Sequence, residues 1–205
     1  MEDLKEIKIF LSCPDDIIKN LHLIDIIEKI ILEENLHFRI YGLKLELRHW
    51  KKNIYPGKGS PRVQDRINQR LVENCDIFLG ILWIRFGSSP GTNLEGKSYS
   101  SGTEEEFHLA KSLNKELWIF ICDIPFKPSK IDPIQLSKVK RFKEDLKNED
   151  VEYVEFSVEE EFRDMLRRTI LEWLSKKYSI KATEKKEISS SLPTKDDFRK
   201  YTKGF

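Results

Sequence analysis

The sequence predicts an α/β domain in which a five-stranded, mainly parallel sheet is covered by helices on both faces, making a three-layer sandwich. Short runs of β-forming residues alternate five times with segments of helical periodicity, a pattern typical of βαβ units. Two of the runs are continuously apolar, as expected for strands covered on both faces. A hydrophobic fraction of 39% is enough for a packed core. Because crossovers between parallel strands are right-handed, few topologies remain, and we expect the strand order 2-1-3-4-5.

The predicted strands are rich in β-branched, aromatic and other apolar residues, and they cover residues 7–11, 38–47, 76–84, 117–122 and 151–156. The last of them is the weakest, and we place it at an edge of the sheet. Apolar residues at helical spacing predict helices over 15–31, 63–72, 103–113, 135–146 and 158–177. The stretches 56–61, rich in Pro and Gly, and 85–102, which is polar, are predicted loops.

The charge balance excludes a general nucleic-acid coat, because 36 Lys and Arg residues nearly cancel 35 Asp and Glu residues and leave a net charge of +1. No apolar run approaches the ~20 residues that a membrane-spanning helix needs, and the charged N-terminus does not resemble a signal peptide. We therefore expect a cytoplasmic protein whose domain binds neither nucleic acid nor membrane. The cysteines Cys13, Cys75 and Cys122 are widely spaced at apolar runs, which predicts reduced, buried thiols and no metal site.

The chain is predicted to have two parts, an α/β domain over residues 1–177 and a basic tail rich in Ser and Lys over residues 178–205. The tail carries seven Lys or Arg residues against four acids, and Ser189, Ser190, Ser191 and Pro193 lie in its middle. This composition is typical of a linker or a tail. The alternative is that it leads into another domain, and the sequence leaves both possibilities open.

The predicted ligand site lies where the strand order reverses, outside the carboxyl ends of the first and third strands. The loops there are residues 12–15 and 85–102, and the second is long, as functional loops often are. It leads into a helix that carries Thr103 and Glu106 near its start. One interpretation is helix capping, with Thr103 as N-cap and Glu106 completing a capping box. The other is a catalytic carboxylate at the mouth of the crevice.

A carboxylate at this place suits the cleavage of a glycosidic bond, because that reaction passes through an oxocarbenium-like state that a negative charge stabilises. The N-terminal end of the helix would help to keep Glu106 ionised. A single carboxylate suits a ribosyl bond to nicotinamide, since that leaving group departs neutral and needs less help from an acid. Trp50 and Trp83 are candidates for stacking on adenine or nicotinamide, or else core or rim residues. Arg85 is a candidate phosphate ligand, or else part of a structural salt bridge.

Several of these motifs resemble a known family. The first strand followed by Ser12 looks like the opening of TIR-like domains. Residues 64–87, with Asp76-Ile77-Phe78-Leu79-Gly80-Ile81 and Arg85-Phe86-Gly87, are similar to a bacterial TIR-like family of formerly unknown function, which often precedes NACHT-type or other STAND ATPase modules in defence proteins. Ser101-Gly102-Thr103-x-x-Glu106-x-x-x-Ala110 fits the same family and looks like the Gly-Thr-x-x-Glu-x-x-x-Ala stretch of nucleoside deoxyribosyltransferases. The resemblance covers residues 6–175 and is strongest over 64–110.

The resemblance implies a flavodoxin-like, TIR-like fold and a catalytic role for Glu106, as for the corresponding Glu of TIR NADases and deoxyribosyltransferases. It implies an NAD-cleaving effector domain of a bacterial antiphage protein, in which NAD or a related nucleotide is the substrate and not a cofactor. It also implies that the domain self-associates and that a C-terminal ATPase or sensor domain follows it. The substrate-binding residues would be Ser12, Asp15, Trp50, Trp83, Arg85, Phe86, Gly87 and Thr103. The Trp-Cys pair that often precedes the Glu in TIR proteins is absent, and Glu104 and Glu105 are extra acids, so the choice of Glu106 depends on register.

Two other functions compete with this one. Many TIR-like domains only associate, so a non-catalytic oligomerisation or signalling module is the first alternative. Residues 91–98 match the P-loop pattern GxxxxGK[ST], and residues 117–123 resemble a strand ending in a Walker B acid, so a P-loop NTPase is the second. A P-loop needs its first Gly directly after a strand and its Lys-Ser pair at a helix start, whereas six residues separate the third strand from Gly91 and residues 99–102 do not begin a helix. A further motif, Gly57-Lys58-Gly59-Ser60, lacks the third Gly of a dinucleotide fingerprint and is predicted to be a surface loop.

Overall fold

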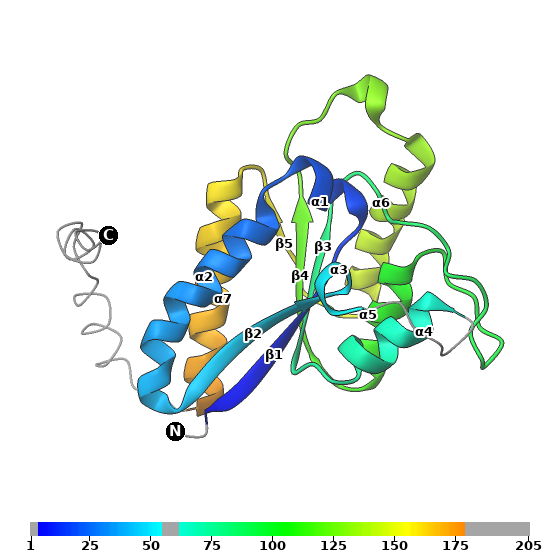
Figure 1. Cartoon of the computed structure of the whole chain (residues 1–205). Coiled ribbons are helices and arrows are strands. Elements are labelled where there is room, and N and C mark those ends of the chain that lie inside the picture. Colours follow the sequence, from blue (N-terminus) through cyan, green and yellow to red (C-terminus); the bar gives the residue numbers. More distant parts are fainter. Residues whose placement is uncertain (1–3, 55–61, 179–205) are drawn as a thin grey trace, which may run out of the picture. The chain divides into compact units, whose positions relative to one another are not determined.

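The sheet of this protein is seen in a computed structural model that describes residues 4–54 and 62–178. Its five strands lie in the order β2-β1-β3-β4-β5, and every pairing is parallel (Figure 1). The strands are β1 (Lys5–Ser12), β2 (Leu43–His49), β3 (Ile77–Leu82), β4 (Glu116–Cys122) and β5 (Val154–Phe156). The predicted α/β class, strand order and edge position of the last strand are therefore confirmed. The predicted loop 56–61, the motif within it and the tail from residue 179 onward lie outside the described residues.

Helices cover both faces of the sheet. Helix α2 (Leu23–Phe38) lies on one face, and α4 (Val63–Ile67), α5 (Gly102–Ser112) and α6 (Pro133–Asn148) lie on the other (Figure 1). A π-helical turn, η2 (Asn68–Val72), continues α4 without a break. Shorter helices are α1 (Asp15–Asn20), η1 (Arg39–Tyr41), α3 (Trp50–Asn53) and η3 (Pro128–Lys130).

Aromatic rings join the second of these helical layers to the sheet. The Phe78 ring of β3 lies 6.0 Å from the Phe10 ring of β1 and 6.3 Å from the Phe107 ring of α5, measured between ring centroids. Phe107 in turn lies 5.0 Å from Phe142 of α6. All four side chains are buried, so α5 is fixed on the sheet directly beside the carboxyl ends of β1 and β3.

The structure corrects the first predicted helix and the start of the second predicted strand. The helix predicted over 15–31 is divided, because α1 ends at Asn20 and α2 begins at Leu23. The strand predicted to begin at Phe38 begins at Leu43 instead. Phe38 is buried and continues the apolar stripe of α2 seven residues after Ile31, and Gly42, with a φ of +69°, closes the turn before β2.

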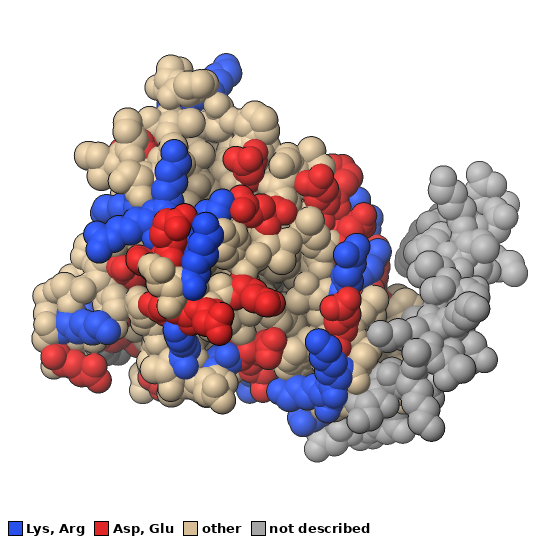
Figure 2. Space-filling model, turned by 180° about the vertical axis from the view of Figure 1, so that it is seen from behind, with Lys and Arg blue, Asp and Glu red and all other residues tan. Residues whose placement is uncertain are grey.

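The chain forms two compact units, residues 1–163 and 164–205. The first holds the sheet, helices α1 to α6 and the start of α7 (Glu159–Tyr178), where Phe162 packs its ring 5.3 Å from that of Phe120. The described part of the second is the remainder of α7. None of the described helices is long and apolar enough to cross a membrane. On the face that Figure 2 shows, Lys and Arg side chains are interspersed with Asp and Glu side chains.

Candidate active site

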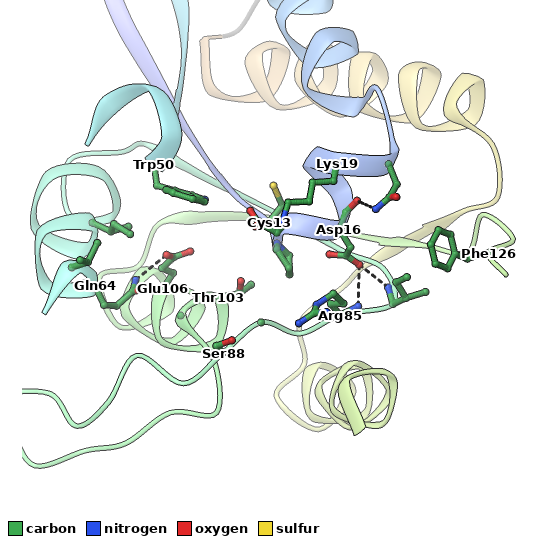
Figure 3. A pocket seen from close by; sticks show the side chains of 18 of the residues that line it. Cys13, Asp16, Lys19, Trp50, Gln64, Arg85, Ser88, Thr103, Glu106 and Phe126 are labelled. Carbon is green, nitrogen blue, oxygen red and sulfur yellow. Dashed lines mark hydrogen bonds and ion pairs between the residues drawn. The ribbon is translucent and has the colours of Figure 1, made fainter. Parts of the chain in front are cut away.

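A pocket of about 610 Å³ opens at the carboxyl ends of β1 and β3, the place predicted from the strand order. The loop after β1, the short helix α3, the first turn of α4, the loop after β3 and the start of α5 supply most of its wall (Figure 3). In Figure 3 the Glu106 carboxylate and the Trp50 ring border one end of the open space, and Arg85 and Phe126 lie toward the other end. The Glu106 carboxylate and Arg85 therefore lie toward opposite ends of the pocket.

Glu106 lies in the wall of this pocket, and two donors hold its carboxylate. The Ser12 hydroxyl at the end of β1 donates a hydrogen bond to Oε2. The side-chain amide of Gln64, on α4, donates to Oε1 from a distance of 2.8 Å. Only 6% of the Glu106 residue is exposed. Three elements that are far apart in the sequence thus converge on one carboxyl group.

Burial controls the ionisation of Glu106. The pKa of this carboxyl is raised from 4.5 to about 7, chiefly because burial removes hydration that the charged form needs. The negative charge of Glu105 contributes to this rise, and the hydrogen bonds from Ser12 and Gln64 oppose it, since they favour the carboxylate. Near neutral pH, Glu106 therefore exchanges between its acid and its carboxylate.

The N-terminus of α5 is capped by residues other than those predicted. The helix begins at Gly102, and the Ser101 hydroxyl accepts a hydrogen bond from the backbone N–H of Glu104 at 3.0 Å. The Glu104 carboxylate accepts hydrogen bonds from the backbone N–H and the hydroxyl of Ser100. The capping interpretation of Thr103 and Glu106 is wrong, because the helix starts before Thr103. Glu106 is consequently available to the pocket.

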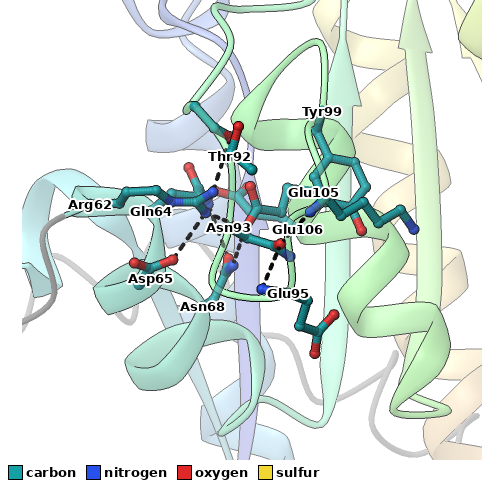
Figure 4. A network of polar contacts seen from close by, with 12 residues as sticks. Arg62, Gln64, Asp65, Asn68, Thr92, Asn93, Glu95, Tyr99, Glu105 and Glu106 are labelled. Atoms are coloured by element: carbon teal, nitrogen blue, oxygen red, sulfur yellow. Dashed lines mark hydrogen bonds and ion pairs between the residues drawn. The ribbon is translucent and has the colours of Figure 1, made fainter.

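Behind Glu106, a chain of polar contacts crosses from α4 to α5 (Figure 4). The Gln64 amide nitrogen also donates to Oδ1 of Asn68 at 3.0 Å, and the Asn68 amide nitrogen donates to Oε1 of Glu105 at 2.9 Å. Arg62 forms ion pairs with Glu105 at 2.5 Å and with Asp65 at 3.0 Å. Asn68 begins the π-helical turn, a type of distortion that is frequent at functional sites.

Asp16 holds the entrance of the loop after β3. Its Oδ2 atom accepts hydrogen bonds from the backbone N–H groups of Ile84 at 3.1 Å and Arg85 at 3.0 Å. Burial raises the pKa of the Asp16 carboxyl above its ordinary value, and these backbone donors oppose that rise. Three cationic side chains contribute to the wall of the pocket, those of Arg85, Lys19 and Lys130.

The structure brings together six of the nine residues predicted for the site. The pocket is lined by Asp15, Trp50, Arg85, Gly87, Thr103 and Glu106. Ser12 lies behind Glu106 and touches it, at 1% exposure. Trp83 and Phe86 do not line this pocket. Trp83 donates from its indole nitrogen to the Ile124 carbonyl at 2.8 Å, and Phe86 packs 5.2 Å from Phe142 in the core, because both continue the apolar run of β3.

Sequence reasoning missed Gln64 and Asp16 as parts of the site. The one signal for Gln64 was Gly102, which begins α5. A Cβ atom at this glycine would lie only 2.5 Å from the Gln64 side-chain oxygen, so any larger residue here would displace the Gln64 amide. No comparable signal distinguished Asp16 from its neighbour Asp15.

Cys13 also lines the pocket, but its thiol is not activated. Burial raises the pKa of this thiol, and the charges of Glu106 and Asp16 raise it further. Since the thiolate is the nucleophilic form, Cys13 is unsuited to nucleophilic catalysis.

The P-loop alternative is contradicted by the backbone of residues 91–98. Thr92 pairs with Ser98 in an antiparallel bridge, and the Asn93 side chain accepts hydrogen bonds from the N–H groups of Glu95 and Lys97. These contacts form a closed hairpin loop, and the next helix begins only at Gly102. Lys97 therefore does not stand at a helix start, which a phosphate-binding loop requires.

The chain is similar to a family of known proteins and to several solved structures. The family model described as "Domain of unknown function (DUF4062)" matches residues 44–171. No curated protein matches the chain. Among solved structures, the CMP N-glycosidase BcmB of Clostridium botulinum is 14% identical with a TM-score of 0.36, covering 78% of this chain and 97% of its own. The translation elongation factor SelB of Methanococcus maripaludis is 14% identical with a TM-score of 0.43, covering 84% of this chain and 34% of its own.

Proposed function

Because the chain belongs to the DUF4062 family, a domain of unknown function, we propose a function from its site: cleavage of the N-ribosyl bond of a nucleotide, with NAD as substrate and Glu106 as the catalytic residue. The observation that carries the proposal is the Glu106 carboxyl group, which two donors hold in the wall of a pocket where ligands bind in sheets of this order.

The chemistry follows from the charge that develops in the reaction. As the bond between the base and the ribose breaks, positive charge spreads over the anomeric carbon and the ring oxygen. A carboxylate that faces this charge lowers the barrier, and it acts more strongly in a buried site than in water. Ser12 and Gln64 fix the carboxylate beforehand, so little reorganisation is needed when the bond breaks.

The other acids of the pocket favour a leaving group that needs no proton. Asp15 is engaged by Lys19 at 2.8 Å and by Lys51 at 3.4 Å. Asp16 is engaged by two backbone N–H groups. Nicotinamide is cationic within NAD and leaves as a neutral molecule, so its departure requires no general acid. In the proposed complex with NAD, Trp50 would stack on a ring of the substrate, and Arg85 would bind the pyrophosphate.

The resemblance of residues 64–110 to TIR-like domains supports a wider proposal. The domain would act as an effector in a bacterial antiphage protein, with turnover that depends on self-association and with an ATPase or sensor domain on the C-terminal side. Nicotinamide release per molecule should then rise with protein concentration, and it should rise further when the chains are cross-linked through a fused dimerisation module. A rate per molecule that is constant across both conditions would contradict the dependence on assembly.

The test of the catalytic role is nicotinamide release from NAD by the wild type and by Glu106→Gln, which keeps the size of the side chain. We expect the rate to fall about 100-fold or more, because the charge that stabilises the ribosyl cation is lost. Glu95→Gln, in the exposed hairpin, is the matched control and should retain the wild-type rate. Analysis of the products separates hydrolysis from cyclisation and base exchange.

Equal release by the wild type and Glu106→Gln would refute the catalytic role. Absence of turnover in the assembled wild type, together with self-association that survives Glu106→Gln, would instead support the non-catalytic signalling module.

A further inference from the structure

We propose that Gln64 is the positioning residue of Glu106, and that Asn68 fixes the direction in which the Gln64 amide acts. The catalytic meaning of this inference rests on the proposed function, whereas the orientation of Gln64 is a property of the fold. Gln64 sits on α4, 42 residues before Glu106 and outside the motif of residues 101–110 that carries it.

Both N–H groups of the Gln64 amide are used. The same nitrogen donates to Glu106 Oε1 at 2.8 Å and to Asn68 Oδ1 at 3.0 Å. Gln64 is 8% exposed, so water does not compete freely for these contacts. A side chain with both donors satisfied in a buried site is held in one orientation.

The chain of contacts decides which end of the amide faces Glu106. An amide presents either an acceptor or a donor, and the network around it determines the choice. The Glu105 carboxylate is paired with Arg62 and accepts from the Asn68 nitrogen, which turns the Asn68 oxygen toward Gln64 (Figure 4). The Gln64 nitrogen must then point to Asn68 and to Glu106. Gln64 therefore donates to both Asn68 and Glu106, and Asn68 donates onward to the Glu105 carboxylate, which also accepts from Arg62.

Gly102 makes room for this arrangement. A Cβ atom at Gly102 would lie 2.5 Å from the Gln64 side-chain oxygen and 3.3 Å from its amide carbon. An alanine at this position would push the amide away from the start of α5. Gly102→Ala thus perturbs the Gln64 contact without changing either Gln64 or Glu106.

The consequence for Glu106 is a preference for the carboxylate and a fixed direction. The Gln64 donor favours the ionised form and lowers the pKa of Glu106, against the larger effect of burial. Removing that donor should therefore raise the pH at which Glu106 ionises, and it should free the carboxyl to turn. A residue that only filled space would have neither effect.

The experiment compares Gln64→Met, which keeps the length of the side chain and removes the donor, with Gln69→Met, the same change at an exposed position five residues later. Carbon-13 spectra of protein labelled at the glutamate carboxyl give the titration of Glu106, whose signal is assigned by its loss in Glu106→Gln. Circular dichroism melting curves confirm that each variant is folded. Nicotinamide release is measured from pH 5 to pH 9.

We expect Glu106 to titrate at higher pH in Gln64→Met than in the wild type, and the rising limb of the pH–rate profile to move with it. At pH 7, kcat should fall about tenfold with KM changed less than about twofold, because the lost hydrogen bond is to a charged group. Gln69→Met should match the wild type in both measurements. Gly102→Ala should shift the Glu106 titration in the same direction as Gln64→Met.

An unchanged Glu106 titration in both Gln64→Met and Gly102→Ala would overturn the proposal. If Gln64→Met does not fold, the Glu106 titration in Gly102→Ala alone tests the proposal, and an unchanged titration there overturns it. The titration needs no turnover, so a wild type that releases no nicotinamide refutes the proposed function and leaves the test of Gln64 intact.

Discussion

At the scale of single residues, the Glu106 carboxyl combines two opposed requirements. Catalysis of the proposed kind needs the carboxylate, and burial favours the neutral acid. The hydrogen bonds from Ser12 and Gln64 lower the pKa of Glu106, but they do not offset the effect of burial, since the pKa still lies at about 7. The site therefore carries an ionisable group whose charged form reduces the stability of the fold, as is frequent where function and stability compete.

This conflict predicts how stability changes with pH. The pKa of Glu106 is about 7 in the folded chain against an ordinary value of 4.5, so between these values the unfolded chain has released a proton that the folded chain still holds. The free energy of unfolding contributed by this group is fully present below pH 4.5 and is lost as the pH rises through 7. Relative to the wild type, Glu106→Gln should gain roughly 1–3 kcal/mol of stability between acidic and mildly alkaline pH.

Urea unfolding of both proteins across that pH range measures the gain. Two stability curves that run parallel from acidic to alkaline pH would contradict the buried, raised-pKa carboxyl. Glu95→Gln again serves as the control, because Glu95 is exposed.

At the scale of elements, two side-chain oxygens fasten the loop that follows β3. Asp16 of α1 accepts from the N–H groups of Ile84 and Arg85, and Oε1 of Gln135 of α6 accepts from the N–H groups of Phe86 and Gly87 at 2.9 and 3.0 Å. Four successive backbone donors are thus satisfied by residues from two helices. The loop leaves the sheet in one fixed direction, which places Arg85 at the pocket.

Removal of the hydrogen bonds that Asp16 accepts should lower the free energy of unfolding. Asp16→Ala leaves the N–H groups of Ile84 and Arg85 without their acceptor in a buried place, and we expect a loss of about 2–3 kcal/mol in the free energy of unfolding. Asp15→Ala should cost at most about 1 kcal/mol, since it removes only partly exposed ion pairs. Urea denaturation compares the two variants. Equal losses in both would show that the Asp16 contacts contribute little.

The elements also show where sequence reasoning succeeds. Continuous apolar runs identified β3 and β4, because strands covered on both faces leave that pattern in any context. The start of α5 was misplaced, since Ser101 and Thr103 are both good caps and only the surrounding chain selects Ser101. Trp83 and Phe86 were assigned to the pocket, although their direction depends on how the chain leaves β3. Glu106 was found from a local motif, and Gln64 was not, because its contact with Glu106 spans 42 residues of sequence.

At the scale of the whole molecule, the site depends on the aromatic core beneath it. Phe107 follows Glu106 directly, is 1% exposed, and packs between Phe78 of β3 and Phe142 of α6. Residues next to each other on a helix point in different directions, so Phe107 anchors α5 while Glu106 reaches the pocket. The strand order, which alternation and handedness predicted, brings β1 and β3 together under this helix.

Truncation of the Phe107 side chain measures how much this ring contributes to the free energy of unfolding. Phe107→Ala should lower the free energy of unfolding by about 3–5 kcal/mol, because a large ring is lost and a cavity remains. Leu94→Ala, at 86% exposure, should leave it within about 0.5 kcal/mol. Denaturation by urea provides both values. A Phe107→Ala protein as stable as the Leu94→Ala protein would contradict the role of this ring.

The hairpin of residues 92–98 has a practical use. Its two ends are joined by the Thr92–Ser98 bridge, and Asn93 closes its turn, so the tip is braced by its own contacts. A cysteine introduced at Leu94 would place a fluorescent dye at the tip of this hairpin. The native thiols are buried and would therefore compete little for the dye. Energy transfer between dyes on separate chains could then follow assembly in real time, while an unlabelled substrate reports turnover in the same cuvette.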